Sequence, residues 1–291
     1  MDQAHNNNRT ILVTGATGRQ GGAAVRNLLT SGFRVLALTR DDTKPAAVQI
    51  RESGGEIIKG NLDQPESVEP FFRDLYGVFS VQNPWITGLD KEVEHGKRVI
   101  ELSVKAGVKH VIYSSAGPGR EGTGVPHFDT KLQVEESLKN SGLSYTILRP
   151  SGFMELMSDR DFVPPVAVWN ITGKVLGMHF PLNWIAVDDI GAAAALIFSD
   201  PEAWSKKEIS LAGDRKSIAE CMDLYSRVYG KSPFRLPMPV WLFKKIQPDL
   251  YAMFQWMIRE NEPEAIVEQT RKLLPGALNV EAWMNMMKVK V

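Results

Sequence analysis

Three glycines spaced three residues apart, Gly15, Gly18 and Gly21, lie near the start of the chain and could bind a phosphate group. They follow the apolar and β-branched run 10–14 and precede residues 23–30, which have helical periodicity. This order predicts a strand, a tight turn that Gly15 permits, a close phosphate approach at Gly18, and a helix that Gly21 lets pack on the strand. The N–H groups at such a helix start favour anions. The chemistry predicted here is the binding of a dinucleotide pyrophosphate.

A second chemical candidate is the pair His127 and Lys131, which lie four residues apart and share one face of a helix predicted over 128–140. This separation is similar to that of the tyrosine and lysine of short-chain dehydrogenases, where the lysine holds the nicotinamide ribose and lowers the pKa of the tyrosine. We expect the Lys131 cation to lower the pKa of His127 and keep the imidazole neutral, which makes it a weak proton donor. Alternatively, His127 only begins the helix and Lys131 is a surface lysine.

An arginine after the second predicted strand bears on the type of cofactor. An acidic residue there would bind the adenosine ribose of NAD, whereas an arginine accommodates the 2′-phosphate of NADP. The strand predicted over 34–39 is followed by Arg40, and Arg19 in the glycine turn could add a second cation. These residues favour NADP(H) over NAD(H). Two alternatives stay open, because Asp41 and Asp42 could pair with Arg40, or Arg40 could be an ordinary solvated side chain.

The exit of the third predicted strand supplies polar groups for the adenine. Asn61, through its side chain, and Leu62, through its backbone, suit such a contact. The neighbouring Asp63 has a plainer explanation, since aspartate is a favoured helix cap and a helix is predicted to begin near Pro65. The segment is therefore a candidate adenine site with an equally good structural alternative.

The exit of the fourth predicted strand carries Gln82, Asn83 and Trp85. Pro84 disfavours helical geometry at the residue before it, so the chain should leave the sheet extended. This places the two amides and the indole beside the expected nicotinamide, where Trp85 could also contact a substrate. The alternative for Trp85 is burial as a packing residue.

Strands and helices alternate strictly through the first half of the chain, which predicts right-handed crossovers and a parallel, doubly wound α/β sheet of the Rossmann type. Ligands bind such sheets at the carboxyl ends of the strands. The predicted strands are 11–14, 34–39, 56–59, 77–82, 110–114 and 145–148. The first predicted helix follows the glycine turn and ends near residue 29, and the others span 45–52, 65–75, 90–105 and 128–140.

Composition excludes several classes of function. The 291 residues carry 34 basic and 34 acidic side chains and 43% apolar residues, which gives no bulk attraction for nucleic acid or anionic membranes. The single cysteine, Cys221, precludes an internal disulfide, and the scattered histidines lack ligand spacing, so we expect no metal site. The polar N-terminal residues and the lack of a long apolar run predict a cytoplasmic protein without a membrane span.

Several segments together resemble the NmrA-like family of atypical short-chain dehydrogenases. They are GATGRQGG in the glycine turn, TR after the second strand, VQNPW after the fourth, YSSAGP after the fifth, HFDTK, LRPSGFMEL, VDDIG, and LLPGALNVEAWM near the end. The resemblance covers nearly the whole chain. The chain differs from the family pattern at Arg19, where a smaller residue is usual, and in the glycine-rich loop 117–125, whose role the sequence does not give.

The resemblance implies an NADP(H)-binding fold, shared by reductases of quinones and imines and by redox sensors that bind transcription regulators. It places the 2′-phosphate arginine at Arg40, the cofactor-facing lysine at Lys131, and histidine in place of the catalytic tyrosine at His127. The pyrophosphate loop that it implies consists of Gly15, Thr17, Gly18, Gln20 and Gly21.

The chain after the sixth strand predicts a smaller α/β C-terminal lobe, in which residues 163–165 and 170–174 are predicted to be loops. We expect a dinucleotide-binding domain over 1–150 and this lobe over 151–291, with the strand 184–188 and the helix 189–199 able to pack back on the first domain. The segment after the sixth strand is expected to roof the nicotinamide, with cofactor contacts from Pro150 and Phe153 and substrate contacts from Met154 and Glu155; alternatively it is a sealed loop.

Two functions from different classes follow. The first is an NADPH-dependent reductase that transfers hydride to a small hydrophobic carbonyl, imine, quinone or enone without the usual tyrosine acid. In it Lys131 holds the ribose, His127 or a water relays the proton, and Asn83, Ser115 or Glu155 orients the substrate. The second is a non-catalytic NADPH/NADP redox sensor that regulates a protein partner. Monomer and homodimer, the identity of the substrate and the stereochemistry all stay open.

Overall fold

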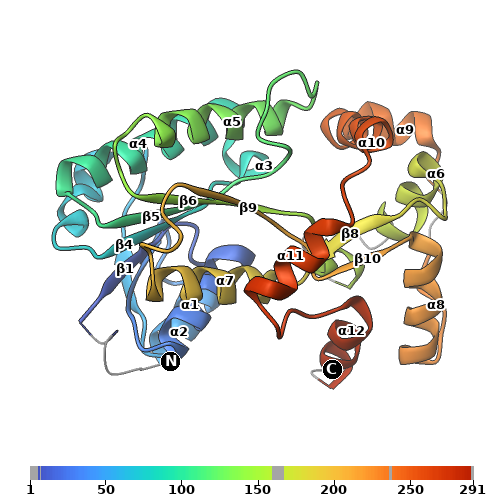
Figure 1. Ribbon diagram of the computed structural model, residues 1–291, viewed down its shortest axis with the longest axis horizontal. Helices are drawn as coiled ribbons and strands as arrows, with labels where there is room; N and C mark the ends of the chain where they lie inside the picture. The colour runs from blue at the N-terminus through green and yellow to red at the C-terminus, as the bar shows by residue number, and fades with distance from the viewer. Residues whose placement is uncertain (1–5, 7, 159–166, 236–237, 290–291) are drawn as a thin grey trace. The chain divides into compact units, whose positions relative to one another are not determined.

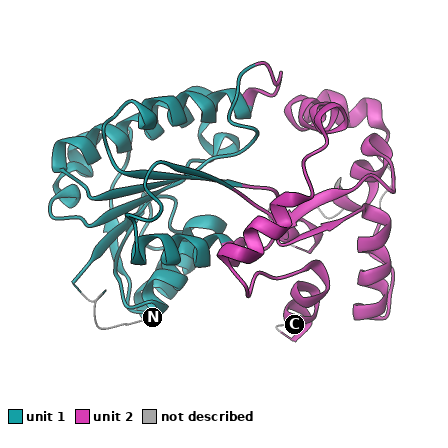
Figure 2. Ribbon diagram, in the orientation of Figure 1, with its two compact units in different colours: residues 1–121, 127–149, 190–209 teal, residues 122–126, 150–189, 210–291 magenta. Residues whose placement is uncertain are grey.

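A computed structural model describes residues 6, 8–158, 167–235 and 238–289 (Figure 1). The chain forms two compact units that are discontinuous in sequence (Figure 2). The first consists of residues 1–121, 127–149 and 190–209, and the second of residues 122–126, 150–189 and 210–291. The segment 190–209 thus belongs to the first unit, although it lies beyond residue 150. A domain boundary at residue 150 stays a prediction.

A seven-stranded sheet with the order β3-β2-β1-β4-β5-β6-β9 organises the first unit. The pairs from β3 through β6 are parallel, which confirms the predicted Rossmann-type fold class. The direction of the strand order reverses between β1 and β4, which is where such sheets bind ligands. The strands are β1 (Thr10–Val13), β2 (Arg34–Thr39), β3 (Glu56–Lys59), β4 (Gly77–Ser80), β5 (His110–Ser114), β6 (Tyr145–Pro150) and β9 (Lys207–Leu211).

Helices cover both faces of this sheet. In Figure 1, α3, α4 and α5 lie over one face, and α1, α2 and α7 lie over the other. Their bounds are α1 (Arg19–Thr30), α2 (Pro45–Glu52), α3 (Pro84–Thr87), α4 (Leu89–Ala106), α5 (Pro126–Lys139) and α7 (Val187–Ser199).

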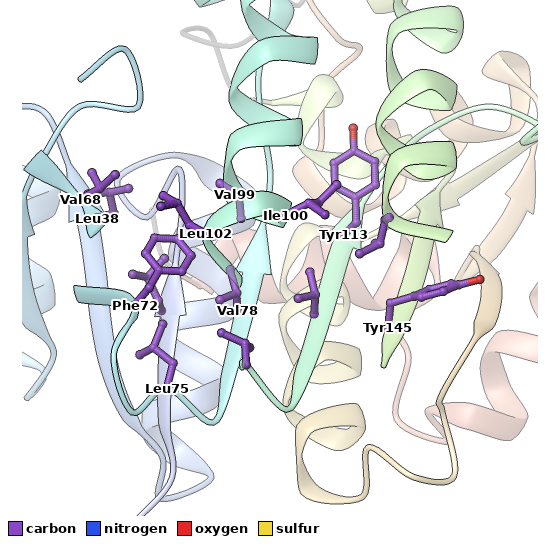
Figure 3. Packing of buried hydrophobic residues seen from close by; sticks show 14 of the residues in the cluster. Leu38, Val68, Phe72, Leu75, Val78, Val99, Ile100, Leu102, Tyr113 and Tyr145 are labelled. Atoms are coloured by element: carbon purple, nitrogen blue, oxygen red, sulfur yellow. The ribbon is translucent and has the colours of Figure 1, made fainter. Parts of the chain in front are cut away.

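The core beneath α4 and α5 is built from one face of the sheet and the apolar stripes of these helices (Figure 3). The central strands β4 and β5 are buried along their whole length, as expected for parallel strands covered on both faces. The labelled residues of the cluster are Leu38, Val68, Phe72, Leu75, Val78, Val99, Ile100, Leu102, Tyr113 and Tyr145.

The prediction of a continuous helix over 65–75 is wrong. Two short 3₁₀ segments, η2 (Pro65–Ser67) and η3 (Glu69–Phe72), take its place. Pro70 has no N–H and its ring would clash with the carbonyl one turn earlier, so a continuous α-helix is excluded here. The Ser67 hydroxyl also takes part in local bonds, as donor to the Gln64 carbonyl at 2.7 Å.

Two predicted strands end differently in the structure. The strand predicted over 77–82 stops at Ser80, because the next amide, Val81 N, donates to the Thr14 hydroxyl at 2.9 Å. The strand predicted over 184–188 is instead β8 (Leu182–Ile185). Residues 187 and 188 already belong to α7, whose Val187 N–H donates to the Glu155 carboxylate at 3.1 Å.

The second unit contains a three-stranded sheet, β10-β8-β7, covered by helices. The loop predicted over 170–174 is wrong, because residues 167–176 are helical; the loop predicted over 163–165 lies outside the described residues. The elements are β7 (Gly152–Phe153), η4 (Met154–Met157), η5 (Ala167–Thr172), α6 (Gly173–Leu176), β10 (Asp214–Lys216), α8 (Ile218–Tyr229), α9 (Val240–Ile246), α10 (Pro248–Glu260), α11 (Ala265–Leu273) and α12 (Val280–Val289).

Candidate functional site

The glycine turn has the geometry that its spacing predicts. Gly15 adopts a φ of +59°, which side chains disfavour, and its carbonyl accepts a 2.9 Å hydrogen bond from Gly18 N. A Cβ at Gly21 would lie 2.2 Å from the Gly15 carbonyl oxygen, so only glycine lets α1 pack this close to the turn. Among the described residues no side chain caps α1, and its first turn holds no acidic residue. The turn therefore leaves a helix start suited to an anion.

Hydrogen bonds bind the glycine turn to the neighbouring strand ends. The Thr14 hydroxyl donates to the Val81 carbonyl at 3.1 Å, which joins the end of β1 to the chain just after β4. The Ser114 hydroxyl donates to Gln20 Oε1 at 2.6 Å, which joins the end of β5 to the first turn of α1. These contacts fix the turn at the reversal of the strand order, where a dinucleotide is expected.

Arg40 is exposed at the end of β2, and the two following carboxylates have other partners. Asp41 accepts hydrogen bonds from the Thr43 hydroxyl and backbone N–H at 2.6 and 3.0 Å, which lower the pKa of Asp41. Asp42 lies 3.3 Å from both Arg51 and Lys59. Both carboxylates, which were expected as possible partners of Arg40, therefore bind other residues in the structure.

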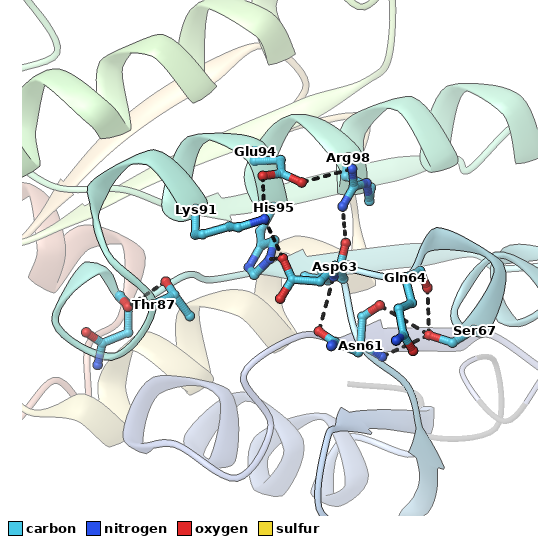
Figure 4. A network of polar contacts seen from close by, with 11 residues as sticks. Asn61, Asp63, Gln64, Ser67, Thr87, Lys91, Glu94, His95 and Arg98 are labelled. Atoms are coloured by element: carbon cyan, nitrogen blue, oxygen red, sulfur yellow. Dashed lines mark hydrogen bonds and ion pairs between the residues drawn. The ribbon is translucent and has the colours of Figure 1, made fainter.

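The candidate adenine segment belongs to a polar network that reaches α4 (Figure 4). Asn61 Oδ1 accepts from Asp63 N at 3.1 Å. Asp63 does not cap the following helix, because its carboxylate lies 2.7 Å from Lys91 Nζ and 3.1 Å from His95 Nε2. The Lys91 hydrogen bond, with that of His95, lowers the pKa of Asp63 to about 2. The Leu62 carbonyl accepts a bond from Arg98, so α4 holds the backbone of this segment in place.

The exit of β4 divides into buried and exposed parts. Gln82 is buried, and its Nε2 donates to Ser80 Oγ at 2.9 Å, while its Oε1 has no partner among the described residues. Asn83 caps α3 by accepting from Trp85 N at 3.0 Å. Trp85 is 55% exposed, so the alternative that it is a buried packing residue is wrong.

Lys131 and His127 both lie in α5 and are both buried. The surface-lysine alternative is therefore wrong. The Lys131 Nζ lies 2.8 Å from Glu92 Oε1 of α4, and this carboxylate is completely buried. Glu92 Oε2 accepts from the Thr130 hydroxyl at 2.5 Å. The ammonium also lies 5.9 Å from the centre of the Tyr113 ring, within the range of a cation–π contact.

The imidazole of His127 is enclosed by aromatic rings. Its centre lies 5.2 Å from the Trp85 ring and 4.7 Å from the Phe128 ring. Burial, with a smaller contribution from the Lys131 cation, lowers the pKa of His127 to about 4. The imidazole is therefore neutral at physiological pH, and its Nδ1 has no partner within the described part of the chain.

Ser115, which was expected to orient a substrate, belongs to a buried ionic network instead. Its hydroxyl donates to Glu135 Oε1 at 2.6 Å. The Arg149 guanidinium binds both oxygens of Glu135, at 2.9 and 2.5 Å, and also Glu208 at 2.5 Å. The network therefore joins the chain just after β5 to α5, β6 and β9.

The segment expected to roof the nicotinamide lies in the second unit. Pro150 and Phe153 are half-buried, whereas Met154 is completely buried in the hydrophobic core of this unit. Glu155 Oε1 accepts from Val187 N at 3.1 Å and from Trp283 Nε1 at 3.2 Å. Burial raises the pKa of Glu155. Within its own unit, this carboxylate ties α7 and α12 to η4.

Glu92 and Tyr113 were missed by reasoning from sequence. Glu92 lies in a helix rich in charged residues, and nothing local distinguishes it from its exposed neighbours. Its contact with Lys131 joins residues 39 apart in sequence, so only the packing of α4 on α5 reveals it. Tyr113 lies within a strand whose five residues are all buried, and its phenol gives no sequence signal either.

Two further findings concern metal ligands and apolar helices in the part of the chain that the structure describes. Within residues 6, 8–158, 167–235 and 238–289, no group of three or more His, Cys, Asp or Glu side chains could hold a metal ion. In the same residues, no helix is long and apolar enough to cross a membrane. Cys221 is buried in α8, and burial raises the pKa of its thiol.

The comparison with protein families decides the identity of the chain. A model of the NmrA-like family matches residues 7–284. The chain belongs to the NmrA-like family. This confirms the predicted resemblance, and the family match extends through both units.

Two relatives of this NmrA-like protein illustrate the range of names in the family. The NmrA-like family domain-containing oxidoreductase notA of Aspergillus sp. is 28% identical over 265 residues, which cover 82% of this chain and 78% of the relative. The photosystem II assembly factor Ycf39 of Trieres chinensis is 26% identical over 253 residues, which cover 85% of this chain and 77% of the relative. The names therefore include both an oxidoreductase and an assembly factor.

Solved structures share the fold of this NmrA-like protein. The negative transcriptional regulator NmrA in complex with NADP has a TM-score of 0.76 and 21% identity, and the match covers 96% of this chain and 95% of that one. The same regulator in complex with NAD has a TM-score of 0.78, 20% identity and the same coverage. Triphenylmethane reductase of Citrobacter sp. with NADP(H) has a TM-score of 0.75 and 18% identity, covering 96% and 99%.

Proposed function

We propose that this NmrA-like protein binds NADP(H) and is a reductase that transfers hydride to a small hydrophobic acceptor. The observation that carries the proposal is Lys131, a buried ammonium on α5 whose charge is balanced by Glu92. A buried lysine is costly unless it is paired, and such groups concentrate at functional sites. A lysine at this place in the fold is suited to hold the nicotinamide ribose.

The residues of the first unit fit the dinucleotide. Gly15, Gly18 and Gly21 form a cradle with a free helix start, and Arg40 offers an exposed guanidinium beyond β2 for the 2′-phosphate. The unpartnered Gln82 Oε1 is a buried acceptor that a carboxamide N–H would satisfy. Two solved relatives of this fold carry NADP or NADP(H), and one carries NAD.

The proton does not come from His127 in this proposal. The pKa of this histidine is lowered to about 4, chiefly by burial, so at neutral pH the imidazole is uncharged and its one N–H is a poor acid. The cofactor supplies the hydride when it is bound. After hydride addition, the acceptor takes its proton from water, and Lys131 provides positive charge near the developing anion.

The acceptor is proposed to be apolar and planar. Trp85 and Ile86, on the short helix α3 beside His127, are 55% and 69% exposed. An exposed indole next to a neutral imidazole offers aromatic faces against which a flat ring can stack. Quinones, aromatic aldehydes, imines and enones share this shape, so they form the acceptor panel for the test.

The proposal is tested by incubating the full chain with NADPH and this panel while the nicotinamide absorbance is followed. We expect loss of absorbance with at least one acceptor. In Lys131→Ala we expect loss of turnover even at saturating NADPH, with NADPH binding weakened but still measurable in calorimetry. Lys105→Ala is the control, because Lys105 is an exposed lysine near the other end of α4 and is paired with Glu69. No oxidation of NADPH with any acceptor would contradict the reductase proposal.

A second candidate function is a non-catalytic NADPH/NADP sensor that binds a regulatory protein. It is favoured by the likeness in fold to NmrA, which is described as a negative transcriptional regulator and is matched over 96% of this chain. In that case the NADPH-bound and NADP-bound forms should bind the partner with different affinities, and neither nucleotide should be consumed. Turnover that depends on Lys131 would contradict a purely sensory role.

A further inference from the structure

The carboxylate of Glu92 is arranged to hold the ammonium of Lys131 in one position. Glu92 lies in the first turn of α4 and is completely buried. Its Oε1 lies 2.8 Å from Lys131 Nζ, and its Oε2 accepts from the Thr130 hydroxyl at 2.5 Å. Since both oxygens are engaged by consecutive residues of α5, the carboxylate cannot rotate without losing a bond. The ammonium is thereby fixed relative to the helix.

A glycine lets the two helices approach closely enough for this pair. A Cβ at Gly96 of α4 would lie 2.7 Å from the methyl groups of Val134 on α5. Gly96 lies one turn after Glu92, and Val134 lies about one turn after Lys131. The close approach at this turn therefore sets the separation at the preceding turn, where the ion pair forms.

Stability alone gives a poor account of this pair. Burying two charges costs desolvation that their attraction only partly repays, and apolar replacements of similar volume are often as stable. The surrounding core is apolar, with Val99, Val134 and Leu138 fully buried nearby in the same cluster. An ion pair kept within such a core is better explained by a task for one of its charges.

We propose that Glu92 is a positioning residue that keeps Lys131 charged and directed at the cofactor site, an inference that rests on the proposed binding of NADP(H). Glu92 does not touch the cofactor in this proposal and acts only through Lys131. Without the carboxylate, a buried ammonium loses its proton more readily, because burial disfavours the charged form. Cofactor binding should then become sensitive to pH through Lys131.

The test measures the NADPH dissociation constant of the full chain by calorimetry between pH 6.5 and 9. Over this pH range we expect the NADPH affinity of Glu92→Gln to fall about tenfold more than that of the native protein. A tenfold loss is the effect of removing one charge-assisted contact. Glu135→Gln is the matched control. It removes another fully buried carboxylate of an ion pair, but its partner, Arg149, keeps its charge throughout this range. A purely structural role would give both variants the same lowered Tm and no added pH dependence.

A second variant covers the case in which Glu92→Gln does not fold. Glu92→Asp keeps the negative charge but shortens the side chain by one methylene, so it withdraws the ammonium without leaving it unpaired. We expect it to fold and to bind NADPH several-fold more weakly at pH 7, with no added pH dependence. Native affinity in Glu92→Asp, or a pH dependence in Glu92→Gln no steeper than native, would overturn the inference. Absence of NADPH binding by the native chain would instead refute the proposed function itself.

Discussion

Arg40 is the residue on which cofactor preference is expected to depend. It is exposed at the end of β2, and both following carboxylates have other partners, since Asp41 accepts from Thr43 and Asp42 is paired with Arg51 and Lys59. A guanidinium binds a phosphate through parallel N–H donors, which an alcohol of NAD does not match. We therefore expect this side chain to bind the 2′-phosphate rather than a neighbouring carboxylate.

Arg40→Ala should weaken NADPH binding about tenfold or more, the effect of removing one or two charge-assisted hydrogen bonds, and should leave NADH binding nearly unchanged. Calorimetric titration with each nucleotide measures both constants. Arg51→Ala is the control, because Arg51 is also an exposed arginine of this region but is paired with Asp42. Equal losses for NADPH and NADH would show that Arg40 does not select the 2′-phosphate.

At this scale the sequence predicted residue types better than their partners. Lys131 and Arg40 could be named because their offsets from a turn or a helix start are local properties of the chain. The partner Glu92 could not, since it lies 39 residues away and is buried only by helix packing. Ser115 follows a strand end and was therefore expected to face a ligand, but Glu135 one helix away takes its hydroxyl. Side-chain partners across elements depend on tertiary packing.

Among the elements, the contact between the glycine turn and α1 is the most demanding. A Cβ at Gly21 would lie 2.2 Å from the Gly15 carbonyl oxygen, a distance that requires the backbone to move. At the next residue, Gly22, the nearest atom to such a Cβ is the Ala16 carbonyl oxygen at 3.4 Å, which is ordinary contact. Close packing therefore requires glycine at position 21 but not at position 22.

Gly21→Ala should destabilise the protein by about 1–3 kcal/mol, because α1 must shift away from the turn, and should weaken NADPH binding. Gly22→Ala should be neutral or stabilise by up to about 1 kcal/mol, because alanine has the higher helix propensity. Urea unfolding followed by circular dichroism, together with NADPH titration, compares the pair. If both variants lose stability equally, close packing at Gly21 is not what constrains the turn.

The elements themselves were predictable where their signals are local. Strands β2, β3 and β5 have the predicted bounds, because each is a short apolar run set off by turn residues. The predicted helix over 65–75 failed at Pro70, whose backbone effect outweighs the helical pattern around it. The end of β8 was misplaced because the start of α7 is set by Glu155, which lies 32 residues earlier.

For the molecule as a whole, buried titratable groups make stability depend on pH in opposite directions. Burial lowers the pKa of His110 and His127 to about 4 in the first unit. Between pH 6.5 and 4 the unfolded chain binds protons at these residues that the folded chain does not, so their contribution to stability is lost as the pH falls. From pH 7 to 5 the loss is about 2 kcal/mol for each histidine.

Asp189 in the second unit acts in the opposite sense. Burial raises the pKa of this carboxyl to about 6, although its bond from Leu278 N at 2.9 Å favours the charged form. Between about pH 6 and 4 the folded chain binds a proton that the unfolded chain does not, so the contribution of Asp189 to stability increases as the pH falls. From pH 7 to 5 this gain is about 1 kcal/mol, which offsets part of the loss at the histidines.

Asp189→Asn should therefore make the protein lose stability more steeply on acidification from pH 7 to 5, by about 1 kcal/mol beyond the native loss. The amide oxygen can still accept the bond from Leu278 N, so the substitution removes the titration and keeps the contact. Urea unfolding at pH 7, 6 and 5 gives the slopes, and Asp223→Asn, which removes an exposed carboxylate from α8 of the same unit, is the control. An unchanged or shallower slope in Asp189→Asn would mean that this carboxyl does not take up a proton on folding in this range, and the opposition between the two units would then be lost.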